Sequence, residues 1–463
     1  MNDYKHAAKN LLADLAAYAR AKGHVAEFLF HAEHNSLVRF ANSAISLNTT
    51  EELVTVSVSV YRENAKGSCA LVTDLAAVDG MRKAVDQAAE IARHAVPATY
   101  HQSITPLSAL PDDDAHFDDA LLDMTPQEKL DYVNRAAAGL ESDALKLAGS
   151  FSSGAVWEAT ANTLGDAVLY HATTDAGASL VINHEKLKWE VQATQSAARK
   201  KDLDPGAVNA DLALLATQYR DGQAVQLPLG THDIVFGSDA TAHVLAFLVW
   251  LGFGGGQCKR NLSCLRDEHI GRKCFSDLFT VIDDPAVRES FPYAFDLNGL
   301  ARTAFPFVER GVFRQFYWDR DSADEFSQKE TAHTVPHLNL AVAPGASSVN
   351  SLKAVLGMKR DKDVLYIPYL HYMNVVNATK GQFTGSSRFG ALLLKQDGSV
   401  AVPYNVRVTD TLFTLFGNID WLSSERVAAD LSMTYGDRNP TAYLVPKFMK
   451  VNNVAVTHAN ASY

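Results

Sequence analysis

An acidic and an imidazole side chain, Asp239 and His243, stand one helical turn apart in the sequence. They follow a short strand-like run at 232–236 and begin an apolar helical stretch over 237–257, in which residues four apart share one face. Such a pair could share a proton or bind a metal ion, but zinc-dependent hydrolysis needs three protein ligands and an activated water. Asp239 could also be the N-cap of the helix. We therefore keep the pair as a candidate catalytic site beside this structural alternative.

Two histidine pairs have spacings that invite comparison with metal sites. His31 and His34 lie in a run of alternating strand type, where residues three apart point to opposite faces. His333 and His337 have the four-residue step of a helical metal site, but Pro336 disfavours a helix there. Both pairs are interpreted as structural or surface histidines.

Three of the four cysteines, Cys258, Cys264 and Cys274, lie in a polar stretch with His269. The group could form a zinc knuckle, but its irregular intervals do not resemble the usual ligand pairs. There is no Cys-x-x-Cys pair, and four cysteines are too few for a disulfide framework in a chain of 463 residues. Reduced thiols are predicted.

Other sequence motifs of catalysis are missing. No Gly-x-Ser-x-Gly elbow, phosphate-binding loop or dinucleotide-binding glycine fingerprint occurs in a strand–turn–helix setting. The glycine run 254–256 lacks the lysine of a phosphate loop and is predicted to end the apolar helix. Asp283 and Asp284 precede Pro285, which is typical of a turn.

The composition indicates a globular protein without a nucleic-acid or membrane partner. A chain of 463 residues with 47% hydrophobic content can bury a large core and is long enough for two or three domains. The net charge of -11 disfavours attraction to phosphate backbones. The longest apolar run, 244–251, is far shorter than the roughly 20 residues that cross a bilayer. The N-terminus lacks the basic and apolar regions of a secretory signal, so a cytoplasmic protein is predicted.

Residue patterns predict an α+β protein in two parts. Residues 1–225 are predicted to form an N-terminal helix-flanked antiparallel sheet domain, because alternating apolar and polar residues, as in 53–61, are typical of strands. Within it, the acidic and proline-rich run 96–124 is predicted to be a surface connection. Residues 226–463 are predicted to form a β-rich C-terminal domain with one central buried helix, the stretch 237–257.

Several longer motifs follow one another over nearly the whole chain. They are Leu37-Val-Arg-Phe-Ala-Asn-Ser-Ala-Ile45, Val281-Ile-Asp-Asp-Pro285, Val308-Glu-Arg-Gly-Val312, Asn339-Leu340 before Pro344-Gly345, Thr379-Lys-Gly-Gln-Phe-Thr-Gly385 and Val451-Asn-Asn-Val-Ala-Val456. Their order resembles the TldD/PmbA family, cytoplasmic proteins long described as modulators of DNA gyrase and now regarded as metalloprotease subunits.

This resemblance implies where a zinc site would lie. The catalytic member of the family carries His-Glu-x-x-x-His on the central helix, and a cysteine near its C-terminus is the third zinc ligand. Here the corresponding positions are held by Ala246, Phe247 and Trp250 or Leu251, and no cysteine follows Cys274. The pattern is similar to the PmbA (TldE-like) branch, whose members lack the motif and pair with a zinc-bearing subunit that degrades unstructured peptides. The resemblance thus implies zinc only in a catalytic partner and no cofactor in this chain.

By the same resemblance, the chain is a non-catalytic subunit, or a homodimeric relative, of a TldD/TldE-type metalloprotease, and it contributes part of a chamber that binds unstructured peptide. The residues predicted to bind the peptide are Asn339, Gly381, Phe383 and Gly385. Two alternatives stay open. One is a stand-alone homodimer that modifies peptides through Asp239, His243 or the cysteines, and the other is a regulatory or scaffold protein.

Overall fold

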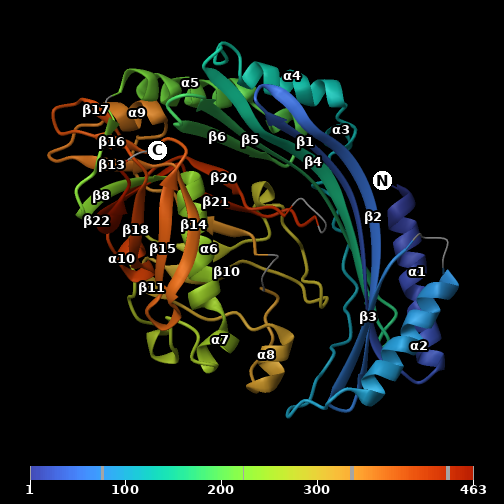
Figure 1. Cartoon of the computed structure of the whole chain (residues 1–463). Helices are drawn as coiled ribbons and strands as arrows, with labels where there is room; N and C mark the ends of the chain where they lie inside the picture. The colour runs from blue at the N-terminus through green and yellow to red at the C-terminus, as the bar shows by residue number, and fades with distance from the viewer. Residues whose placement is uncertain (1, 74–77, 223, 334–337, 434–437, 462–463) are drawn as a thin grey trace.

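The chain forms two bodies (Figure 1). The first contains a strongly curved antiparallel sheet, and the second contains two further sheets and lies on the concave side of the first. The computed structural model describes all residues except 1, 74–77, 223, 334–337, 434–437 and 462–463. Helices and strands are both abundant, which confirms the predicted α+β class. No helix in the described part of the chain is long and apolar enough to cross a membrane.

The curved sheet has the strand order β3-β2-β1-β4-β5-β6, and every neighbouring pair is antiparallel. Its strands are β1 (Val25–Ala41), β2 (Ala44–Arg62), β3 (Ala65–Val72), β4 (Leu145–Asn162), β5 (Val168–His184) and β6 (Glu190–Ala197). In β1, Phe28 and Phe30 belong to an apolar core cluster, whereas His31 and Glu33 belong to the alternate set of positions. Because successive strand residues point to opposite faces, the sheet has one apolar face and one face rich in charged groups.

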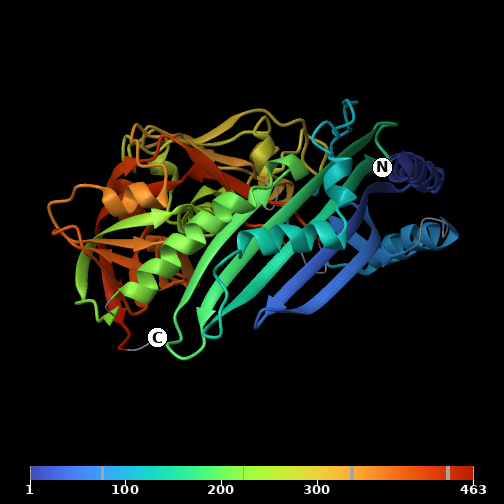
Figure 2. The same cartoon turned by 90° about the horizontal axis from the view of Figure 1, so that it is seen from above.

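Helices cover the apolar, outer face of the curved sheet, and α4 and α5 lie side by side on it (Figure 2). They are α1 (Asn2–Ala21), α2 (Val78–His94), α3 (Asp119–Leu122), α4 (Pro126–Ala136) and α5 (Pro205–Asp221). Helix α4 begins with a capping box in which the Thr125 hydroxyl accepts from the N–H of Glu128 and the Glu128 carboxylate accepts from the N–H of Thr125.

The larger sheet of the second body has the order β14-β15-β18-β22-β8-β13-β16-β17-β7, and β19 also pairs with β22. Its strands are β7 (Ala224–Val225), β8 (Gly230–Gly237), β13 (Val364–Ile367), β14 (Tyr369–Asn377), β15 (Gln382–Arg388), β16 (Leu392–Leu394), β17 (Val400–Pro403), β18 (Val406–Thr411), β19 (Ile419–Leu422) and β22 (Phe448–Ala459). Strand β7 precedes the predicted boundary but pairs with β17 of the second body. The division into 1–225 and 226–463 stays a prediction.

The smaller sheet has the order β11-β10-β9-β12-β21-β20. Its strands are β9 (Val281–Asp283), β10 (Phe305–Glu309), β11 (Val312–Phe313), β12 (Leu340–Val342), β20 (Arg426–Asp430) and β21 (Ala442–Pro446). The helices of the second body are α6 (Ser238–Leu248), α7 (Gly255–Lys259), α8 (Arg320–Glu325), α9 (Leu352–Gly357) and α10 (Leu412–Gly417).

Helix α6 lies between these two sheets, in contact with β8, β14 and β22 of the larger and with β20 and β21 of the smaller. Its N-cap is Gly237, without a side-chain hydrogen bond, so the prediction that Asp239 caps the helix is wrong. The helix continues into a π-helical turn, η2 (Val249–Phe253). Gly254 then leads into α7, so the glycine run begins a short helix as well as ending a longer one.

Arg438 of the second body penetrates the charged face of the curved sheet, and its side chain is fully buried. Its Nε and Nη2 donate to the two carboxylate oxygens of Asp175 at 2.7 and 2.8 Å, and its Nη1 donates to Asn35 Oδ1 at 2.6 Å. Its backbone N–H donates to Glu33. A Cβ on Gly154 would lie 2.1 Å from the backbone oxygen of His34 and 2.8 Å from the guanidinium carbon, so both the neighbouring strand β1 and Arg438 require glycine at this position.

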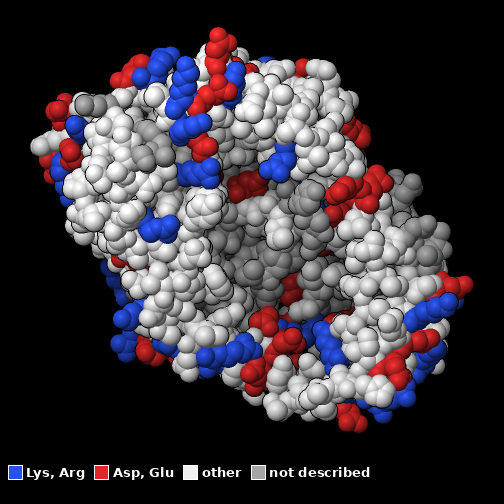
Figure 3. Space-filling model, in the orientation of Figure 1, with Lys and Arg blue, Asp and Glu red and all other residues white. Residues whose placement is uncertain are grey.

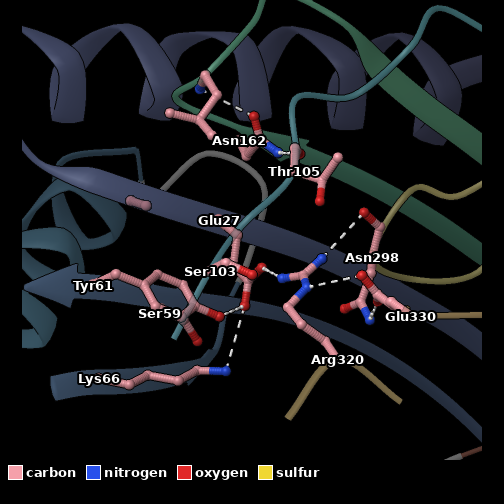
Figure 4. Close-up of polar contacts among 12 residues, drawn as sticks. Glu27, Ser59, Tyr61, Lys66, Ser103, Thr105, Asn162, Asn298, Arg320 and Glu330 are labelled. Carbon is pink, nitrogen blue, oxygen red and sulfur yellow. Dashed lines mark hydrogen bonds and ion pairs between the residues drawn. The ribbon is translucent and has the colours of Figure 1, made fainter. Parts of the chain in front are cut away.

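A second arginine, Arg320 of α8, joins the bodies near the start of β1 (Figure 4). Its Nη1 donates to the Glu27 carboxylate, which also accepts from the Tyr61 hydroxyl and, at 3.4 Å, from Lys66 Nζ. Burial lowers the pKa of Arg320, but the charges of Glu27 and Glu330 outweigh this and raise it above its usual value. The second body is thus attached to the curved sheet through cations that enter its acidic face.

Candidate functional site

One face of α6 is only partly buried, whereas the opposite face packs in the apolar core. Along this face lie Asp239, His243, Ala246, Phe247 and, in the π-helical turn, Trp250; the first four are partly exposed and Trp250 is 57% exposed. Their spacing of three or four residues places them in one stripe. The candidate catalytic pair and the positions that replace the family zinc motif therefore share a single surface, which we call the open stripe.

The first turn of the open stripe lines a cavity of about 320 Å³ between the two bodies. From the curved sheet the cavity is lined by small and polar residues, including Ser150, Ser179, Gln192 and Thr194. From the second body it is lined by Asp239 and His243 of α6, Tyr369 at the start of β14 and Asp430 at the end of β20. Figure 3 shows the molecule hollowed between the two bodies, with acidic atoms inside the hollow.

Asp239 and His243 line the same cavity, but their side chains do not bond to each other. The Thr194 hydroxyl donates to Asp239 Oδ2 at 2.7 Å. His243 Nδ1 lies 2.7 Å from the backbone oxygen of Asp239, and because a carbonyl oxygen only accepts, Nδ1 carries a proton; in the neutral ring Nε2 then keeps its lone pair. Burial raises the pKa of the Asp239 carboxyl. The imidazole is therefore held in one orientation, with Nε2 available as an acceptor or base.

Asp430 adds a second carboxyl group to the cavity, and no sequence motif points to it. Burial, reinforced by the charge of Asp175, raises the pKa of Asp430 to about 6. Its Oδ1 accepts from the N–H of Ser432 at 2.8 Å. Its Oδ2 lies against Gly177 of β5, where a Cβ would be only 2.1 Å away. Glycine in the curved sheet thus makes room for a carboxyl group of the second body.

The residues at the family zinc positions do not fit a zinc ion. Ala246 and Phe247 carry no ligand atoms, and Leu251 is buried in the core at 3% exposure. The Trp250 ring meets Phe247 edge-on with centroids 5.7 Å apart. Among the described residues, no group of three or more His, Cys, Asp or Glu side chains could hold a metal ion.

The four cysteines are free thiols, in agreement with the predicted reduced state. Burial raises the pKa of Cys264 to about 12, and it also raises the pKa values of Cys258 and Cys274. Because a zinc ligand must be a thiolate, these environments do not favour a zinc knuckle.

Asn339, predicted to bind peptide, lies in a buried polar network instead. Asp283 accepts two hydrogen bonds from Arg302 Nη2 at 2.7 and 2.8 Å and one from the N–H of Asn339 at 2.6 Å, and it contacts His333. Although burial raises the pKa of Asp283, His333 and Arg302 hold it below its usual value. Asp283 ends strand β9, and the predicted turn follows it at 284–287, where the N–H of Val287 donates to the backbone oxygen of Asp284 at 3.1 Å. His337 lies outside the described residues.

The other residues predicted to bind peptide also pack in this structure. Phe383 is fully buried. A Cβ on Gly381 would lie 3.1 Å from Cys264, and one on Gly385 would lie 2.9 Å from Met373. These positions support the strands beside the open stripe rather than offer surface to a peptide.

His31 has a structural role, as the sequence suggests. Its ring nitrogens lie 3.0 Å from Glu158 Oε1 and 3.2 Å from Glu33 Oε2. Burial lowers its pKa, but the hydrogen bonds to these two carboxylates raise it to about 10. The imidazolium therefore belongs to the charged face under the second body and does not act as a metal ligand.

Two family models match the chain. The model for the PmbA/TldA metallopeptidase C-terminal domain matches residues 229–458, and the model for PmbA/TldA metallopeptidase domain 1 matches residues 26–92. The first match includes the open stripe and the second includes most of β1 to α2. No curated protein matches the chain.

Solved structures share the fold over almost the whole chain. TldE from Thermococcus kodakarensis matches with a TM-score of 0.79 at 16% identity, over 98% of this chain and 100% of that chain. A candidate modulator of DNA gyrase from Bacteroides thetaiotaomicron matches with a TM-score of 0.76 at 16% identity, over 97% and 98% of the two chains. A candidate modulator of a DNA gyrase from Thermotoga maritima matches with a TM-score of 0.75 at 16% identity, over 97% and 99%.

Proposed function

The chain belongs to the PmbA/TldD metallopeptidase family, and from this premise we propose that it is a non-catalytic subunit, or a homodimeric relative, of a family peptidase that acts on unstructured peptides. The observation that carries the proposal is the open stripe, where Ala246, Phe247 and Trp250 stand in place of zinc ligands and base. Hydrolysis then belongs to a zinc-bearing partner subunit, and this chain encloses and holds the peptide.

Strand β14 supports a peptide-binding role. It is the edge of the larger sheet and pairs only with β15 among the described strands. It begins at Tyr369, which lines the cavity, and its Tyr372 and Val376 side chains are 70% and 52% exposed. An edge strand presents unpaired N–H and C=O groups, to which an extended peptide can add as a further strand.

Binding and cleavage of a labelled unfolded peptide test this proposal. The purified chain alone is expected to bind the peptide without cleaving it, and addition of a zinc-bearing family member is expected to produce cleavage that a chelator stops. A peptide of the same sequence with alternate backbone amides N-methylated is the matched control, since it cannot pair with β14 and should bind more weakly. Chelator-sensitive cleavage by this chain alone would refute the non-catalytic role.

The geometry of His243 favours a second candidate, a stand-alone activity on peptides. Its Nδ1–H is fixed on the backbone oxygen of Asp239, which leaves Nε2 oriented as a general base. In that case the chain alone modifies a peptide in the presence of chelator, and His243→Gln abolishes the modification without unfolding the protein.

A further inference from the structure

The cavity beside the open stripe contains hydrogen-bond acceptors with unused capacity. Asp239 accepts a hydrogen bond at Oδ2 from Thr194, and Asp430 accepts one at Oδ1 from the N–H of Ser432, and a carboxylate can accept about four. The Oε1 atom of Gln192 is buried without a hydrogen-bond partner in the described part of the chain. In the neutral form of His243, Nε2 is also an acceptor, because Nδ1 carries the proton. The four residues that carry these carboxyl, amide and imidazole groups all line one space of about 320 Å³.

No lysine or arginine is among the described residues that line the cavity. Arg438 attracts Asp430 electrostatically, but its guanidinium donates to Asp175 and Asn35. The lining hydroxyl groups, such as that of Ser150, can donate hydrogen bonds but carry no charge. Removing carboxylates from water without a cation costs free energy, so the cavity favours an occupant that carries positive charge and several donors.

We propose that this cavity binds the cationic side chain of an arginine or lysine residue in the peptide substrate, an inference that rests on the proposed peptide-binding function. Guanidinium and ammonium groups supply five and three N–H donors, and they match a set of acceptors better than any neutral side chain does. The volume of about 320 Å³ lies at the lower end of the roughly 300–1,000 Å³ of small-molecule pockets, which suits one long side chain. A metal ion is a poorer occupant, because the described residues provide no suitable group of three ligands.

The position of β14 explains how a peptide would deliver this side chain. Tyr369 both begins β14 and lines the cavity, and its ring meets His243 edge-on with centroids 5.0 Å apart. Alternate side chains of an added strand point the same way at a spacing of roughly 6–7 Å, so one of them can enter the cavity while the backbone pairs with β14. The Tyr369 ring can also attract the cation through its π face.

Two peptides that differ in a single group test the proposal. One is an unfolded, labelled peptide with a central arginine, and the other carries citrulline at the same position, which keeps the shape and removes the charge. Fluorescence anisotropy with the full chain is expected to show roughly ten- to hundredfold tighter binding of the arginine peptide, the range expected for hydrogen bonds to a charged group. Asp430→Asn and Asp239→Asn should each reduce this preference. Asp397→Asn, which removes the same charge from an exposed turn, should leave it unchanged.

The possible results separate this inference from the proposed function. Equal affinity for the two peptides in the parent protein would overturn the cation site and leave peptide binding intact. Binding of neither peptide would overturn both. Free arginine amide is expected to displace the peptide, but only at a concentration far above that at which the peptide binds, which supports a side-chain site. If free arginine amide binds as tightly as the peptide, the proposal that the occupant is part of a peptide is overturned. Circular dichroism of each variant establishes that it is folded, and a preference that survives in both folded cavity variants would overturn the proposed location.

Discussion

Replacing Arg438 by methionine should destabilise the protein more than replacing any exposed cation. The guanidinium is fully buried and donates to both carboxylate oxygens of Asp175, whose side chain is 1% exposed. Without the arginine, Asp175 stays buried without its cation and Asn35 loses a donor at 2.6 Å. Breaking one side of a buried ion pair costs about 3–5 kcal/mol. We expect a loss of this size in the free energy of unfolding.

The pair Arg388–Glu190 is the matched control, since it also joins the second body to the curved sheet. Its N–O distance is 3.0 Å, but the two side chains are 34% and 36% exposed. Solvent screens such a pair, so Arg388→Met should cost less than about 1 kcal/mol. Adding Asp175→Asn to Arg438→Met should recover part of the loss, because no charge is then left buried without a partner.

Urea unfolding at pH 7, followed by circular dichroism and tryptophan fluorescence, measures these differences as shifts in midpoint at constant slope. A loss for Arg438→Met that is no larger than the loss for Arg388→Met would refute the reasoning. So would a double variant with Asp175→Asn that is less stable than Arg438→Met alone, because the unpaired carboxylate would then not be the cause.

Three further results are expected. Burial and the charge of Asp175 raise the pKa of Asp430 to about 6, above the roughly 3.9 of an unfolded chain. Between these two pH values the folded state holds a proton that the unfolded state has lost. The resulting contribution to folding stability is present below about pH 4, is lost as pH rises through about 6 and amounts to at most about 3 kcal/mol. The stability of Asp430→Asn relative to the parent should therefore increase from pH 4.5 to pH 7.5, and a constant difference in urea unfolding would contradict this assignment. Thr125→Ala should cost about 1 kcal/mol through loss of the α4 cap, measured by thermal unfolding at pH 7, and no change in midpoint would show that the cap is dispensable. In the same measurement, Leu245→Ala in the fully buried face of α6 should cost about 2–5 kcal/mol and Trp250→Ala on the open stripe about 0.5 kcal/mol or less; similar costs would contradict the division between these faces.

The features that the sequence determined are those that depend on local periodicity. Alternation in β1 predicts a strand with two unlike faces, and the structure shows one face under helices and the other under the second body. The capping box at Thr125 and the apolar pattern of α6 are likewise recognised locally, because their partners lie within one or two helical turns. Absence of the zinc motif is also visible in the sequence, since it concerns residue types at fixed spacing.

The same local reasoning failed where the decisive partner is distant in the chain. Asp283 and Asp284 precede Pro285 and suggest the turn that forms at 284–287, but they do not show that Arg302 and Asn339 reach Asp283 through tertiary contacts and bury it. Asp239 suggests an N-cap, but its carboxylate meets Thr194 of the curved sheet. In each case a side-chain contact between distant elements decides what the carboxylate does, and sequence spacing carries no information about it.

The cavity itself was decided by tertiary structure alone. Gln192 and Thr194 come from β6, Asp239 and His243 from α6, and Asp430 from the end of β20, so these groups meet only because the second body lies against the concave sheet. The sequence established that the central helix lacks zinc ligands. The folded chain decided what stands there instead: a cavity lined by Asp239 and Asp430, whose pKa values are raised because burial removes their carboxyl groups from water.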